Sequence, residues 1–154
     1  MSKGTISYHF NGKDELFAEV VGRVRTAAEE FMVPRLAEAP SLLAWLGTYV
    51  RTNLTFMGAR RDMLTALVEV ITHTPAPNPY LASHQQSLDD LEAVVRAGQD
   101  RGELGRFDPG VFAMAMRGAI DAVPARLAAD PGLHLDMYGN ELAMLFERAA
   151  EVRE

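Results

Sequence analysis

Apolar residues recur every three or four positions along almost the whole chain, and this spacing limits the possible fold more than any other feature. The segment between Lys13 and Pro34 shows it at Leu16, Phe17, Val20, Val21, Val24, Ala28 and Phe31. Such spacing places the apolar side chains on one face of an α-helix, whereas a half-buried strand alternates every second residue. No segment alternates in that way, so the sequence predicts an all-α protein.

Prolines, glycines and capping residues divide this pattern into about six or seven helices. Asn11 followed by Asp14 indicates the start of a long helix that ends near Pro34. Further boundaries are predicted after Pro40, at GARRD (58–62), TPAPNP (74–79) and DRGELG (100–105), at Asp108-Pro109, and at DPG (130–132). Pro124 is expected to kink its helix. We therefore expect a helical bundle.

Composition indicates a single globular domain. At 154 residues the chain is long enough to bury a core without disulfides or metals, and it contains no cysteine. No apolar run approaches the roughly 20 residues of a membrane-spanning helix. We therefore expect a cytoplasmic protein with no membrane partner. The net charge of -6 arises after Arg35, because the first 35 residues hold five basic and five acidic side chains. A less acidic end on an acidic body is compatible with a small DNA-contacting region.

Residues 2–10, SKGTISYHF, and residues 12–17, GKDELF, resemble the TetR (tetracycline repressor) family of bacterial transcriptional regulators. In that family a recognition helix of pattern Ser-x-Gly-Thr-x-x-x-His/Tyr-Phe precedes a long helix that starts Lys-Glu/Asp-x-Leu. The residues in register are Ser2, Gly4, Thr5, His9, Phe10, Lys13 and Leu16. Residues 100–123 are similar to a junction between two helices of the family's ligand domain. The resemblance thus extends over most of the chain and implies a TetR-like bundle.

The resemblance implies DNA contacts from the N-terminal residues. The start of such a helix offers hydroxyl, ammonium and backbone N–H groups to phosphates and base edges. By resemblance, Lys3, Gly4, Ser7 and Tyr8 face bases, whereas Thr5, His9 and Lys13 face the DNA backbone. Ser7 departs from the family, which usually has an aromatic residue there.

Family members carry two further helices before the recognition helix, and Met1 stands where they often have valine. We therefore expect this sequence to be a fragment that starts within a helix-turn-helix. In this interpretation residues 1–33 are the remnant of the DNA-binding domain, and residues 34–154 bind an effector and dimerise. A recognition helix needs its bracing helix. We therefore expect a duplex DNA operator to be a partner of the full-length protein only.

The resemblance also implies an effector pocket and a homodimer, without identifying the small-molecule effector. The residues expected to line the pocket are Trp45, Tyr49, Met63, Leu67, Leu88, Met114 and Arg117. The residues expected at the dimer interface are Gly118, Ala122, Tyr138, Leu142, Leu145, Phe146 and Ala149. Ordinary core packing explains each of these positions as well.

The remaining candidates in the sequence are an ion pair, a metal site and a catalytic motif. Arg117 and Asp121, four residues apart, are expected to pair, although Arg117 alternatively meets an acidic effector. Glu69 and His73 share a helix face and His84 follows, but no further ligand has suitable spacing, so we expect no metal and no cofactor. Enzyme motifs such as nucleophile elbows and Gly-rich phosphate loops are absent. The sequence predicts a small-molecule-responsive repressor and not an enzyme; the alternative is a stand-alone dimeric helical protein that binds a small molecule and no DNA.

Overall fold

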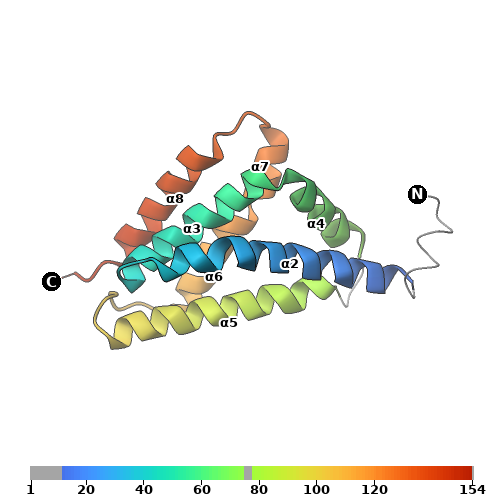
Figure 1. Ribbon diagram of the computed structural model, residues 1–154. Helices are drawn as coiled ribbons and strands as arrows, with labels where there is room; N and C mark the ends of the chain where they lie inside the picture. The colour runs from blue at the N-terminus through green and yellow to red at the C-terminus, as the bar shows by residue number, and fades with distance from the viewer. Residues whose placement is uncertain (1–11, 75–77, 154) are drawn as a thin grey trace.

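The computed structural model describes residues 12–74 and 78–153, and in these residues the regular structure is entirely helical (Figure 1). The helices are α2 (Lys13–Ala37), α3 (Leu42–Ala59), α4 (Arg61–His73), α5 (Pro79–Asp100), α6 (Pro109–Asp121), α7 (Val123–Ala129) and α8 (Leu135–Ala150). The all-α bundle predicted from apolar spacing is confirmed.

Short polar side chains cap the start of three of the described helices. The Ser41 hydroxyl accepts a hydrogen bond from the Ala44 N–H at 3.1 Å, and the Asn78 side chain accepts one from the Tyr80 N–H at 2.9 Å. The Asp108 carboxylate does the same for the Val111 N–H at 2.8 Å. Each cap satisfies an N–H group that has no partner within its helix. The helix starts predicted at Asn78-Pro79 and Asp108-Pro109 are confirmed.

Two proline predictions need correction. Helix α2 does not end near Pro34 but continues to Ala37, with Pro34 inside its last turns. Pro124 does not kink a continuous helix, because α6 ends at Asp121 and Pro124 lies in the first turn of the separate helix α7. A first-turn proline leaves no hydrogen bond unmade, since its missing N–H would lack a partner there anyway. The predicted capping residue Asn11 lies outside the described residues.

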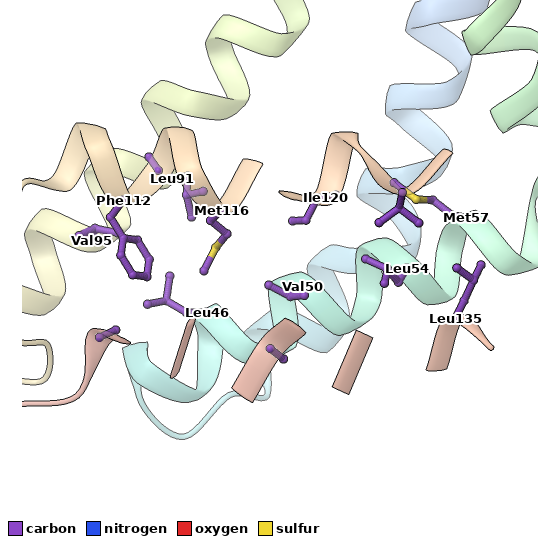
Figure 2. Close-up of a cluster of buried hydrophobic side chains, with 14 of the residues drawn as sticks. Leu46, Val50, Leu54, Met57, Leu91, Val95, Phe112, Met116, Ile120 and Leu135 are labelled. Atoms are coloured by element: carbon purple, nitrogen blue, oxygen red, sulfur yellow. The ribbon is translucent and has the colours of Figure 1, made fainter. Parts of the chain in front are cut away.

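Helix α3 lies at the centre of the molecule and contacts α2, α4, α5, α6 and α8 (Figure 1). Its residues Leu46, Val50 and Leu54 are completely buried and point into a cluster shared with the neighbouring helices (Figure 2). From those helices the cluster receives Leu91, Val95, Phe112, Met116, Ile120 and Leu135. This cluster is the hydrophobic core of the bundle.

Small residues bring α8 close to α3. Gly139, Ala143 and Ala150 of α8 are buried, and a Cβ at Gly139 would lie 3.4 Å from Leu54. The two helices are also joined by Arg51, whose Nη1 and Nη2 donate to the two carboxylate oxygens of Glu147 at 3.0 and 3.2 Å. Glycine and alanine permit this close packing because they leave room for the facing helix.

None of the helices in the described part of the chain is long and apolar enough to cross a bilayer.

Candidate functional site

A cavity of about 410 Å³ lies between α2, α3, α4 and α5, and α6 contributes one residue to its wall. Helices α2 and α5 run beside each other over part of their length, and α2 also packs on α3 and α4 (Figure 1). The volume is within the range of about 300–1,000 Å³ that is typical of small-molecule sites.

Most of the cavity wall is apolar. The apolar lining residues are Val21, Val24, Ala28, Met32, Val33 and Leu36 from α2, Phe56 and Met57 from α3, Leu64 and Leu67 from α4, and Leu91 and Val94 from α5. Helix α2 supplies the largest share, because its apolar positions recur at helical spacing and face the other helices. A ligand in this cavity would therefore contact α2 directly.

Two pairs of stacked rings also line the cavity. Trp45 and Tyr49 of α3 stack with ring centroids 5.3 Å apart and planes inclined by 13°. Tyr80 and His84 of α5 stack with centroids 5.7 Å apart and planes inclined by 28°. In each pair the residues are four positions apart, which places both rings on one helix face.

The polar end of the cavity is organised by Arg117 of α6. Its Nε and Nη2 donate to Oδ1 of Asp121 at 3.0 and 2.7 Å, which confirms the predicted pairing. Its Nη1 donates to the Tyr49 hydroxyl at 2.9 Å and lies 3.5 Å from Oδ1 of Asn53. Only 13% of the Arg117 side chain is exposed, so these bonds form away from bulk water.

His84 approaches the same carboxylate from α5. Its Nδ1 lies 3.2 Å from Oδ2 of Asp121 but does not have hydrogen-bond geometry, and that nitrogen is buried. The Asp121 carboxylate thus lies between a guanidinium on its own helix and an imidazole on another. This arrangement connects α5 and α6 at the polar end of the cavity.

Burial and charge set the protonation of two groups here. Desolvation alone would lower the pKa of Arg117, but Tyr49 and Asp121 together outweigh it, so the pKa is raised and the guanidinium stays charged. Burial, helped by the charge of Asp121 and opposed by Arg117, raises the pKa of the Tyr80 phenol to about 12. Tyr80 is therefore neutral at physiological pH.

The rim of the cavity carries charged side chains that already have partners. Arg25 Nε contacts Oε1 of Glu29 at 2.7 Å on the surface of α2. The Asp90 carboxylate accepts a hydrogen bond from Gln86 Nε2 at 2.8 Å. Val33, also in the lining, is 58% exposed, which places the opening beside α2.

The structure brings together four of the seven residues expected in an effector pocket. Trp45, Tyr49, Leu67 and Arg117 line the cavity, whereas Met63, Leu88 and Met114 are not among its lining residues. Met114 is 62% exposed, because the buried face of α6 is formed by Phe112, Ala113, Met116 and Ile120 instead. Helical spacing alone did not show which side of α6 faces the cavity.

The residues expected at a dimer interface divide into two groups. Gly118, Ala122, Tyr138, Leu145 and Ala149 are exposed. Leu142 and Phe146 instead pack against the chain's own core, and Phe146 contacts Phe112 edge to face with centroids 5.6 Å apart. Only the exposed group is fully available to another molecule.

Six of the residues expected to contact DNA, namely Lys3, Gly4, Thr5, Ser7, Tyr8 and His9, lie outside the described residues. Lys13 begins α2 and is exposed. Glu69 and His73 form an exposed pair at 3.3 Å, whereas the His84 ring lies beside the Asp121 carboxylate. Within residues 12–74 and 78–153, no three His, Cys, Asp or Glu side chains are grouped so as to hold a metal ion.

Several residues of the cavity wall were not among those expected from the sequence. On α5 the cavity is lined by residues that follow one another at intervals of four, three and four, so they share one helix face. They are Tyr80, His84, Ser87 and Leu91. That spacing was a signal available in the sequence. Asn53, four residues after Tyr49, was available by the same reasoning.

The described helices have a TetR-like fold. A TetR family transcriptional regulator, PfmR from Thermus thermophilus, has a TM-score of 0.77 and 15% identity, with 96% of this chain and 82% of that one covered. A tetR-family regulatory protein from Rhodococcus RHA1 has a TM-score of 0.73 and 15% identity, covering 100% and 82%. The fatty acid degradation regulator FadR from Bacillus halodurans has a TM-score of 0.72 and 18% identity, covering 96% and 78%.

No protein-family model matches the sequence, and no curated protein matches it. At these low identities the structural similarity establishes the fold alone.

Proposed function

We propose that this protein is a small-molecule-responsive transcriptional regulator of the TetR type, and that its cavity binds the effector. The observation that carries the proposal is that α2 forms a large part of the cavity wall. Helix α2 begins at Lys13, directly after the segment in which we expect the DNA contacts. One helix therefore connects the cavity with the expected DNA-binding residues.

The same helix provides a physical route for regulation. A ligand changes a conformational equilibrium only through its different affinity for the two states. A ligand that fills the cavity contacts α2 on one side and α3 to α6 on the other, so its affinity depends on where α2 lies. By thermodynamic reciprocity, DNA that fixes α2 in one position changes the affinity for the ligand.

The proposal includes a homodimer, which gives two DNA-contacting segments. An exposed stripe of apolar and small residues is formed by Val111, Met114 and Gly118 of α6 together with Ala122 at its C-cap. On α8, Leu145 is 63% exposed and Ala149 is exposed as well. Exposed apolar stripes on two helices are typical of surfaces that another protein covers.

Light scattering tests this surface. Leu145→Glu should convert a dimer to a monomer at micromolar concentration, because a carboxylate would be buried without a partner. The control is Val68→Glu on α4, where the valine is 40% exposed and the helix packs mainly on α2 and α3, and this change should leave the mass unaltered. A wild-type protein that is already monomeric contradicts the dimer.

DNA selection tests the regulator itself. The protein should be expressed from its complete reading frame, including any in-frame codons before Met1, and incubated with fragments of its own genome. We expect one or a few fragments to be enriched, and binding to weaken strongly as salt rises. Enrichment of no fragment by a protein that binds small molecules would favour the stand-alone dimer.

A further inference from the structure

The charges at the polar end of the cavity cancel one another. Arg117 makes two hydrogen bonds to Asp121, and the two side chains are only 13% and 25% exposed. At the rim, Arg25 is paired with Glu29, and Arg60 is paired with Asp62 at 3.1 Å. Each arginine of the lining is therefore neutralised, so an incoming anion meets no unpaired cation among the described lining residues.

Tyr49 presents a hydrogen-bond donor at this end. Because Arg117 remains a cation and can only donate, the Tyr49 hydroxyl accepts its hydrogen bond at 2.9 Å. The hydroxyl's own hydrogen has no acceptor among the described residues. Asn53 faces the same guanidinium nitrogen, since its Oδ1 lies 3.5 Å from Arg117 Nη1, and its Nδ2 donates to the main-chain oxygen of Tyr49 at 2.8 Å. A ligand oxygen placed here would satisfy the free donor.

The rings of the wall favour a flat ligand. The stacked pair Trp45–Tyr49 belongs to α3 and the stacked pair Tyr80–His84 belongs to α5, and both line the same space. Aromatic groups gain from offset stacked or edge-to-face contacts with such rings beyond the area that they bury. An aliphatic chain of equal size would lack this contribution.

We propose that the cavity binds an uncharged, planar aromatic molecule whose carbonyl or similar oxygen accepts a hydrogen bond from Tyr49. This inference rests on the proposed function, since it names the chemical class of the effector. At the polar end a charged group would be buried beside a closed ion pair, and burying a charge without a partner is costly. Asp90, a lining carboxylate hydrogen-bonded to the neutral Gln86, is exposed at the rim and lies outside this buried end.

Trp45 is the only tryptophan in the chain, so its fluorescence reports directly on the cavity. Four probes of similar size test separately whether the ligand must be aromatic and whether it must be uncharged. They are 2-acetylnaphthalene, 2-naphthoate, 2-naphthylmethylammonium and the aliphatic 2-dodecanone. Fluorescence titration, with melting temperature as a second readout, should rank the aromatic ketone first. We expect it to bind at least about tenfold more tightly than either charged naphthalene.

Two variants test the hydrogen bond from Tyr49 and the ion pair between Arg117 and Asp121. Tyr49→Phe should weaken the ketone about three- to tenfold by removing one hydrogen bond, whereas the control Thr65→Val, which removes an exposed hydroxyl from α4 outside the cavity, should not change it. Asp121→Asn should leave Arg117 without its counter-ion and raise the affinity for 2-naphthoate at least about tenfold. If Asp121→Asn fails to fold, the Tyr49→Phe comparison still tests the site.

The outcomes separate this inference from the function on which it rests. Tighter binding of 2-naphthoate or 2-naphthylmethylammonium by the wild type overturns the requirement for an uncharged ligand, and leaves the cavity as an effector site. Equal binding of 2-dodecanone overturns the requirement for a ring. Binding of none of the four overturns the inference, and DNA selection then decides whether the regulator stands without it.

Discussion

Helix α3 has two neighbouring faces, one buried in the core and one lining the cavity. Leu46, Val50 and Leu54 on one face are completely buried in the core shared with α5, α6 and α8. One residue earlier in each turn, Trp45, Tyr49 and Asn53 line the cavity beneath α2. A rotation of about 100° around one helix therefore separates a filled apolar interior from a hollow one with a polar end.

The difference shows how one small bundle combines rigidity with binding. The core face packs closely against side chains of the neighbouring helices, and this packing fixes the position of α3. The cavity face leaves space between α3 and α2, where a ligand can replace missing packing contacts. Stability is expected to depend mainly on the first face, and ligand affinity on the second.

The largest effect should come from truncating a core leucine. Leu54→Ala removes a completely buried side chain and should lower the free energy of unfolding by about 2–5 kcal/mol. Leu67→Ala, beside the open cavity, should cost only about 1 kcal/mol, because its neighbours already leave space. Urea denaturation at one protein concentration measures both, and equal losses would contradict the contrast between the two faces.

Replacing a glycine by alanine should lower the free energy of unfolding in a packed region and raise it in an open one. A Cβ at Gly98 would lie 2.5 Å from Cγ of the buried Leu104, so Gly98→Ala should destabilise the protein by about 1–3 kcal/mol. Gly22 of α2 is exposed, and a Cβ there would have no atom within 4 Å apart from its chain neighbours and the backbone of its own helix. Gly22→Ala should therefore stabilise α2 by about 0.5–1 kcal/mol. Thermal melts of the two variants provide the measurement.

The smallest effect concerns the polar end of the cavity. The Tyr80 pKa is raised from 10.0 to about 12 by burial and by Asp121, so the folded state holds this proton more tightly than the unfolded state. Its stabilising contribution is complete below pH 10 and is lost as pH rises from 10 to 12. Because Tyr80 is partly exposed, screening reduces the change to about 1 kcal/mol.

Urea titrations between about pH 9 and pH 12 test the role of Tyr80. Tyr80→Phe should flatten the decline in unfolding free energy relative to the wild type. An unchanged pH dependence in Tyr80→Phe would show that the phenol does not titrate differently in the folded protein.

Part of the cavity was predictable from the sequence. Trp45, Tyr49, Leu67 and Arg117 were predicted to share a site, and the pairing of Arg117 with Asp121 followed from their four-residue spacing. Met114 could not be distinguished from these residues, since apolar character alone does not tell whether a side chain faces a cavity, the core or solvent. The structure places it on the exposed side of α6.

The sequence by itself determined the helices and most of their boundaries. These depend on local effects, namely apolar spacing, proline and the capping of N–H groups at Asn78 and Asp108. Only the tertiary structure decided that α2 closes a cavity over α3, and that Tyr49, Asn53 and His84 meet Arg117 and Asp121 at its polar end. Those contacts join residues far apart in the chain, and they depend on how the helices rotate and pack against one another, which local spacing does not fix.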